Sequence, residues 1–245
     1  MKLISLRKKI DNIDRQIIKL LNKRASIAKS VGKLKRRAGR DVYVPDREVQ
    51  IYKNILKKNK GPLSDKALKA IYREIMSSSL SLEKSLKIAY LGPETTFTHL
   101  AAIKKFGSQV EYASCDSITE VFREVELSRA DYGVVPVENS IEGAVNHTLD
   151  MFINSDLKIC SEVLLEISHN LIGRCNMGCV KRVYSNPQVF GQCRSWLDSH
   201  LRGVELVEVS TTSKAAEIAS KENNASAIAS SLAAEKFKLR FWPEP

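Results

Sequence analysis

The strongest constraint in this sequence is a seam of apolar residues that repeats in steps of three and four along the first 34 positions. Such spacing places the side chains on one stripe of a single long helix. At 1.5 Å per residue, a helix over residues 3–36 would extend about 50 Å, longer than a small domain is wide. Another chain, or long partner helices, must therefore cover much of the seam, and we expect an intertwined helical dimer. The seam consists of Leu3, Leu6, Ile10, Ile13, Ile17, Leu20, Ile27, Val31 and Leu34.

Two further helices follow the first. Gly39 ends the long helix and Pro45 favours a new start, which predicts a second helix over 46–58. Ser64 is a plausible N-cap for a third helix over 65–84. The N-terminal part is thus expected to be all helical.

Charge divides the chain at about the same place. Residues 1–86 hold 23 Lys+Arg against 8 Asp+Glu, a net +15, and the remaining residues hold 16 against 20, a net −4. We therefore expect two domains, over residues 1–85 and 86–245, with different electrostatic tasks. A block at +15 attracts nucleic acid, an acidic lipid surface or a small polyanion, and composition alone does not choose between them.

After Leu86 the hydrophobic period changes to that of an α/β domain with mostly parallel strands. Strands are predicted at 86–92, 109–114, 131–137, 157–165, 182–186 and 204–210. Helices are predicted between them at 97–106, 117–127, 187–199 and 212–222. The sequence has no apolar run suited to a membrane span or a secretory signal, so a cytoplasmic chain is expected. The five cysteines have no zinc-like spacing, and we expect reduced thiols and no metal.

Arg24 is the single charge on the apolar seam, where burial is costly unless an anion meets it. Lys35 follows 11 residues later, which returns it to within about 20° of the Arg24 direction. The two side chains can converge on one small dianion. Arg7 lies 17 residues before Arg24, about 25 Å away, so it could join that site only from a partner protomer. The alternative is that Arg24 pairs with an acidic residue of another helix and Lys35 is solvated.

The other two helices carry polar residues of the same kind. The second opens with Asp46, Arg47 and Glu48, and the third presents Ser79 and Glu83 at an i, i+4 spacing. Taken alone, such residues commonly compensate a helix dipole or face water. Taken together, the strings LRKKID, LLNKRASIAKSVGKLK, YVPDRE and IYREIMSSSLSLE resemble the all-helical chorismate mutase family over residues 3–84.

That resemblance implies a role for each residue. Arg24, with Arg7 from the second protomer, would hold the substrate carboxylates, and Lys35 and Glu83 would act at the ether oxygen. Arg47 would support the anion site, Glu48 would accept from the ring hydroxyl, and Ser79 would help to hold a carboxylate. Chorismate to prephenate is a unimolecular [3,3] rearrangement, so the site needs only to hold the folded conformer and stabilise charge on the ether oxygen. Val44 and Glu83 stand where many members have Asp and Gln.

The second block carries four segments that follow predicted strands: LGPETTFTHLA (91–101), VVPVENSIEGAVNHTLD (134–150), VYSNPQVFGQC (183–193) and VSTTSKAA (209–216). Such positions line the cleft at the carboxyl ends of parallel strands. In this order they resemble the prephenate dehydratase family, and the whole chain resembles bifunctional chorismate mutase/prephenate dehydratases. The resemblance implies a two-lobed, periplasmic-binding-protein-like α/β domain, incomplete at its C-terminus, with the site between its lobes. Its substrate residues would be Thr96, Thr98, Glu138, Asn139, Ser185, Gln192, Ser210 and Thr211.

Several features depart from that family. Thr95 stands where Gly is usual, which disfavours a positive φ and would close the turn. The Thr-Arg-Phe motif expected to supply the proton donor is not found, and Leu239-Arg240-Phe241 is the nearest string. The tail from Arg240 is expected to leave the family pattern, and we expect no phenylalanine-sensing ACT domain after it. Weak or absent dehydratase activity and no feedback by phenylalanine are therefore expected.

We therefore expect an enzyme of phenylalanine biosynthesis that acts on chorismate and prephenate without a cofactor and that forms a homodimer. A second possibility is a module that binds an aromatic acid without turning it over. A third is nucleic-acid binding by the basic block, which would show a steep salt dependence. We expect neither a nucleic acid nor a membrane as partner.

Overall fold

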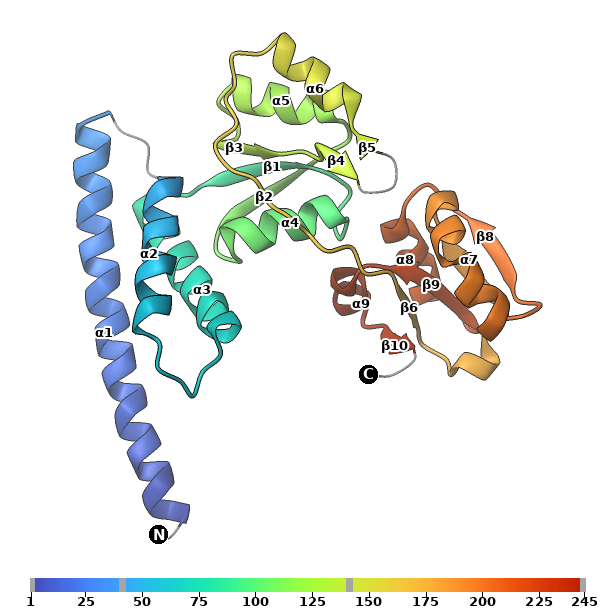
Figure 1. Cartoon of the computed structure of the whole chain (residues 1–245), viewed down its shortest axis with the longest axis horizontal. Helices are drawn as coiled ribbons and strands as arrows, with labels where there is room; N and C mark the ends of the chain where they lie inside the picture. The colour runs from blue at the N-terminus through green and yellow to red at the C-terminus, as the bar shows by residue number, and fades with distance from the viewer. Residues whose placement is uncertain (1–2, 40–42, 140–142, 243–245) are drawn as a thin grey trace.

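The computed structural model describes residues 3–39, 43–139 and 143–242, and within them three consecutive parts can be distinguished (Figure 1). The first is helical, and the other two are lobes that each contain a sheet. The helical part consists of α1 (Leu3–Arg37), α2 (Pro45–Lys58) and α3 (Asp65–Glu83).

Helix α1 is long and mostly uncovered. It packs against α3, which in turn packs against α2, and much of its length extends past both (Figure 1). Leu3 is 62% exposed and Leu20 is 64% exposed. Gly32 is the buried residue of this helix. The apolar seam therefore faces outward along most of the single chain.

The first lobe is a small parallel sheet with helices on both faces (Figure 1). Its strand order is β2-β1-β3, and both pairings are parallel. Ser117 and Thr96 cap helices α5 and α4 with their side chains. A separate antiparallel pair, β4 with β5, lies beside the sheet. The elements are β1 (Lys87–Leu91), α4 (Phe97–Phe106), β2 (Glu111–Cys115), α5 (Ile118–Glu126), β3 (Tyr132–Val134), β4 (Glu138–Asn139), β5 (Gly143–Ala144) and α6 (Asn146–Ile153).

The second lobe contains a five-stranded sheet of order β10-β6-β9-β7-β8. Strand β7 pairs in parallel with β8 and β9, whereas β6 pairs antiparallel with β9 and β10. Alanines of β9 and α8 form much of its core, which brings helix and sheet close together. The elements are β6 (Asn170–Gly173), a 3-10 turn (Met177–Cys179), β7 (Arg182–Ser185), α7 (Pro187–His200), β8 (Glu205–Glu208), α8 (Thr212–Lys221), β9 (Ala225–Ala229), α9 (Ser231–Phe237) and β10 (Arg240–Trp242).

The helical part is docked onto the first lobe through buried and polar contacts. Tyr43, just before α2, is 6% exposed and belongs to the same core cluster as Ile88 and Phe106. Glu74 of α3 accepts hydrogen bonds from the backbone N–H and the hydroxyl of Ser108. One residue from the helical side of the chain thus completes the core of the sheet.

The sequence predicted the three N-terminal helices within a residue or two, and Ser64 does cap α3. Helices α4, α5, α7 and α8 were also predicted correctly. The strand predicted at 157–165 was wrong. That segment has no regular structure, and Leu164 within it is 86% exposed, because it forms the connection between the lobes rather than a sheet strand. The sequence missed β4, β5, β6, β9, β10, α6 and α9.

In the part of the chain that the structure describes, we find no helix with the length and apolar character that crossing a bilayer requires.

Candidate functional site

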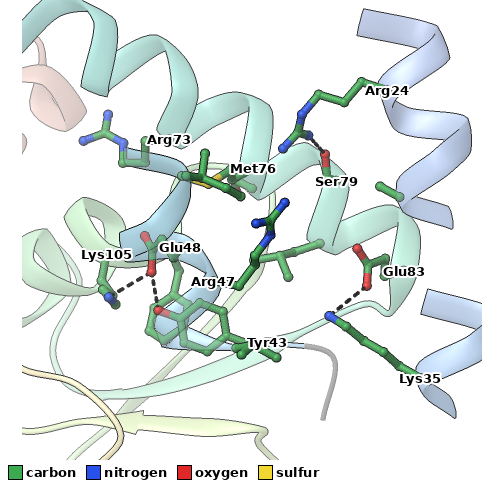
Figure 2. Close-up of a pocket in the computed structure, with 16 residues that line it drawn as sticks. Arg24, Lys35, Tyr43, Arg47, Glu48, Arg73, Met76, Ser79, Glu83 and Lys105 are labelled. Carbon is green, nitrogen blue, oxygen red and sulfur yellow. Dashed lines mark hydrogen bonds and ion pairs between the residues drawn. The ribbon is translucent and has the colours of Figure 1, made fainter. Parts of the chain in front are cut away.

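A pocket lies where α1, α2, α3 and α4 approach one another (Figure 2). Arg24 and Lys35 reach it from α1, Arg47 and Glu48 from α2, and Ser79 and Glu83 from α3. Lys105 and Phe106 reach it from α4 of the first lobe. Every residue predicted for the first site therefore lines one pocket, with the exception of Arg7, which lies on the exposed N-terminal part of α1.

Arg24 and Ser79 form one side of the pocket. The Arg24 Nη1 atom donates to Ser79 Oγ, and Ser79 Oγ donates to the Ile75 carbonyl oxygen at 2.8 Å. Arg24 Nη1 also donates to the Ile75 carbonyl oxygen at 3.5 Å, so among the described residues its hydrogen-bond partners are a neutral hydroxyl and a carbonyl rather than the carboxylate of the alternative prediction. The guanidinium keeps its charge available for an anion in the pocket.

Lys35 and Glu83 form the other side. Lys35 Nζ lies 3.6 Å from Glu83 Oε2, and the Glu83 side chain is 8% exposed. Oε2 is buried and has no hydrogen-bond partner among the described atoms. Burial raises the pKa of Glu83, and the nearby charges of Lys35, Arg36 and Arg24 oppose that shift without cancelling it. A carboxyl in such a place retains its proton to higher pH.

Gly32 is what allows α1 to lie so near to Glu83. A Cβ atom on Gly32 would lie 2.7 Å from Glu83 Cγ. Arg36, one helical turn further on, donates to the Glu83 carbonyl oxygen. The last turn of α3 is therefore held against α1 by a glycine and an arginine, and this contact fixes where the Glu83 carboxyl lies.

Glu48 lies at the base of the pocket and is held from two directions (Figure 2). Its Oε2 atom accepts from Tyr43 Oη at 2.5 Å and from Lys105 Nζ at 3.0 Å. Burial, followed by this bond to Glu48, raises the pKa of Tyr43, so its phenol remains a neutral donor. Sequence reasoning missed Tyr43 and Lys105. Lys105 is 57 positions from Glu48, and no local pattern signals such a contact.

The residues predicted for the second site lie on both lobes. Thr96 and Thr98 lie at the start of α4, and Glu138 and Asn139 lie in β4, all in the first lobe. In the second lobe, Ser185 ends β7, Gln192 lies on α7, and Ser210 and Thr211 precede α8. Most of these residues lie at strand ends or helix starts, as the sequence predicted.

Several of these eight residues form hydrogen bonds that stabilise the local fold. Ser185 Oγ is buried and donates to the Ile228 carbonyl oxygen at 2.9 Å. Thr96 and Thr211 accept from backbone N–H groups as N-caps. Gln192 Oε1 lies 2.7 Å from His169 Nε2. The predicted substrate role of these eight residues is not tested by this arrangement.

The two lobes meet at Thr95, which sequence reasoning treated as a departure. Its φ is 71°, so the residue adopts the left-handed conformation that the sequence analysis expected it to avoid. Thr95 Oγ1 lies 2.6 Å from Ser213 Oγ, and Ser230 Oγ donates to the Thr95 carbonyl oxygen at 2.7 Å. Two hydrogen bonds with the second lobe thus hold the turn in this conformation.

Metal binding has no support in the described residues, where no cluster of three potential ligands occurs. The arrangement defines a protein with a helical part, whose pocket is lined by several basic side chains, followed by a two-lobed α/β part. The model of the prephenate dehydratase family matches residues 88–244, and that of chorismate mutase type II matches residues 6–84. The chain belongs to the prephenate dehydratase family and carries a chorismate mutase region before that domain.

Relatives with both regions are similar over nearly the whole chain. The bifunctional chorismate mutase/prephenate dehydratase of Aquifex aeolicus is 50% identical over 239 residues, which are 96% of this chain and 66% of that protein. The protein of the same name from Pseudomonas aeruginosa is 45% identical, with the same two coverages. This chain thus spans slightly under two thirds of the length of these relatives.

A solved prephenate dehydratase from Arthrobacter aurescens, in complex with L-Phe, is similar in fold. Its TM-score is 0.58 at 30% identity, and the match covers 64% of this chain and 54% of that one. The family model also corrects one sequence-based expectation. The tail was expected to leave the family pattern at Arg240, but the match continues to residue 244, and β10 pairs in register with β6.

Proposed function

We propose that the helical part converts chorismate to prephenate by [3,3] rearrangement. The observation that carries this proposal is the convergence of Arg24 and Lys35 from α1 with Ser79 and Glu83 from α3 around one pocket. Chorismate is a dianion that rearranges without a nucleophile. A site for it needs cations, neutral donors and a fixed shape, and these residues supply them.

Each side of the pocket has its own task in this proposal. Arg24 and Ser79 bind a carboxylate, with Arg47 supporting the anion. Lys35 and a protonated Glu83 donate to the ether oxygen as negative charge develops on it, and the raised pKa of Glu83 favours the donor form at that position. Glu48 accepts from the ring hydroxyl.

The same proposal includes an intertwined homodimer. Apolar residues of the α1 seam are exposed in the single chain; Ile10 is 57% exposed and Ile27 also 57%. A second copy would cover them and bring its own Arg7 to the pocket, where Arg7 would bind the second carboxylate. An apolar stripe of this length exposed to water favours association, because burying it against a second helix removes apolar surface from water.

We further propose that the two-lobed part, which would be periplasmic-binding-protein-like, acts on prephenate. The product would be phenylpyruvate, formed by loss of the ring hydroxyl together with decarboxylation. The family membership supports this, as do the eight polar residues, most of which lie at strand ends or helix starts. Both reactions would take place in the cytoplasm and serve phenylalanine biosynthesis.

The test is a chorismate turnover assay on this protein that follows prephenate and phenylpyruvate separately. We expect prephenate to form. The sequence-based expectation of weak dehydration predicts little phenylpyruvate, and abundant phenylpyruvate would contradict it. If neither product forms but chorismate raises the melting temperature, the chain is an aromatic-acid binding module and the proposal is wrong.

A further inference from the structure

An ion pair joins the helical pocket to the α/β part of the chain. Lys105 Nζ, on α4 of the first lobe, lies 3.0 Å from Glu48 Oε2. The two side chains are 17% and 14% exposed, so water screens their attraction only partly. Both residues line the pocket that we propose as the mutase site.

Tyr43 holds the same carboxylate oxygen. Its hydroxyl donates to Glu48 Oε2, and its ring is fixed in the core of the first lobe against Phe106 and Tyr132. Lys105 Nζ also lies 5.7 Å from the centroid of the Tyr43 ring. The contacts described for Glu48 thus converge on Oε2, and Oε1 is the oxygen left to accept from a ligand.

We propose that Lys105 is a positioning residue for the mutase reaction and that the α/β domain in this way helps to build the active site of the helical domain. Lys105 acts through Glu48: it fixes the carboxylate so that Oε1 meets the ring hydroxyl of chorismate. This inference rests on the proposed mutase function. A carboxylate held in advance loses less freedom when substrate binds, so Lys105 contributes to productive binding without touching the reacting atoms.

The chain offers a matched control for the test. Lys104 is the neighbouring residue on α4, but its Nζ donates to the Leu164 carbonyl oxygen at 2.8 Å, away from the pocket. We expect Lys105→Met to lower the kcat/KM for chorismate about 10-fold, because a misplaced binding group commonly costs that much or more. Lys104→Met should leave it within about two-fold, and Lys105→Arg should recover part of the loss.

A double substitution separates positioning from a general loss of structure. If Lys105 acts through Glu48, Lys105→Met has no further effect once Glu48 is replaced by Ala, because no carboxylate remains to be held. An equal loss in the Glu48→Ala background would overturn the inference, since Lys105 would then act by another route. Equal kcat/KM for Lys105→Met and Lys104→Met would overturn it as well.

Two further outcomes distinguish a failure of the positioning role of Lys105 from a failure of the proposed mutase function. If the unaltered protein forms no prephenate, the mutase proposal itself fails, whatever the variants do. If Lys105→Met loses activity together with its cooperative thermal transition, the role of Lys105 is structural and the positioning role is rejected.

Discussion

At the scale of single residues, the chemistry that we propose for the helical pocket depends on the protonation of Glu83. Its side chain is nearly buried, and Lys35 Nζ lies 3.6 Å from its Oε2 atom. Burial is the largest influence and raises the pKa, while three cations lower it by less. The Glu83 carboxyl therefore stays protonated to a higher pH than an exposed glutamate does, and in that form it can donate a hydrogen bond as a neutral amide can.

This leads to a prediction about pH. Only the protonated carboxyl can donate to the ether oxygen. As pH rises through the raised pKa of Glu83, the donor form is lost and mutase kcat should fall. Glu83→Gln keeps a donor at every pH, so its profile should be flat over the same range. The measurement is kcat for chorismate as a function of pH in both proteins.

Glu74, on the same helix, supplies the control for this comparison. Hydrogen bonds from Ser108 and Arg73 outweigh its partial burial and lower its pKa, and it lies outside the pocket. Glu74→Gln should keep the pH profile of the unaltered protein. Superimposable profiles for Glu83→Gln and the unaltered protein would exclude Glu83 as the titrating donor.

The residues that sequence reasoning found and missed differ in one respect. Arg24 and Lys35 could be predicted because the periodicity of one helix places them on the same side. Ser79 and Glu83 could be predicted because they lie one helical turn apart. Lys105 and the positive φ of Thr95 could not, because both depend on contacts across more than 50 positions. The hydrogen bonds to Ser213 and Ser230 offset a strain that costs about 1–3 kcal/mol for a residue with a side chain.

At the scale of elements, the crossing of α1 and α3 decides whether the pocket forms. The helices approach closely at Gly32, the glycine of α1. Because this residue has no side chain, its backbone can lie against the Cα, Cβ and Cγ atoms of Glu83. Arg36 adds a donor to the Glu83 carbonyl oxygen beside that crossing. The distance between the two helices therefore sets the distance between Lys35 and Glu83.

We predict that Gly32→Ala lowers mutase activity more than it lowers stability. Alanine gains about 1 kcal/mol of helix propensity over glycine, whereas the new contact costs about 1–3 kcal/mol of overpacking. The near balance leaves the melting temperature little changed while α3 and Glu83 shift. Activity and thermal unfolding should be measured together. Ser30→Ala, at an exposed position of α1, is the control and should change neither by much; an unchanged kcat/KM in Gly32→Ala would contradict the prediction.

An element could be predicted from the sequence when its own side chains carry a clear hydrophobic period. The amphipathic helices carry a clear period, and they were found. Strand β9 is Ala-Ser-Ala-Ile-Ala, buried at all five positions, and small residues of low strand propensity give no alternating signal. The segment 157–165 had such a signal but remains an exposed connection, because no neighbouring strand pairs with it.

At the scale of the whole molecule, we propose that the mutase site is shared between two chains. Arg7 and Arg24 lie on one straight helix about 25 Å apart, so one small substrate cannot reach both in a single protomer. The exposed seam of α1 provides the surface on which a second copy would bring its Arg7 to the first copy's pocket.

A mixing experiment tests this arrangement. Arg7→Ala and Arg24→Ala should each be nearly inactive alone, because each dimer then lacks one carboxylate contact at both sites. After the two are unfolded and refolded together, a mixed dimer has one site with both arginines and one with neither. Activity should therefore return to about a quarter of the normal level, since about half the dimers are mixed and each has one intact site. Mixtures no more active than the separate variants would exclude a shared site; refolded Arg24→Ala alone is the control.

The charge division and the ranges of the two family matches place the junction of the two parts near residue 86. The hydrophobic core of the first lobe nevertheless includes a residue from before that junction. Tyr43 packs with Leu86, Ile88 and Phe106, and its hydroxyl reaches Glu48 in the helical pocket. One side chain thus serves the core of the sheet with its ring and the proposed mutase site with its hydroxyl.

This shared tyrosine has a direct consequence for any attempt to express the helical part and the α/β part separately. A chain that starts at residue 86 would lack the ring that covers Phe106 and Tyr132, and would expose apolar surface at that place. A chain that stops at residue 85 would keep Tyr43 but remove Phe106 and Tyr132, the two aromatic rings that its own ring contacts. In this protein, the helical part and the first lobe are therefore joined by packing as well as by the continuous chain, because each part supplies side chains that the other part's core contacts.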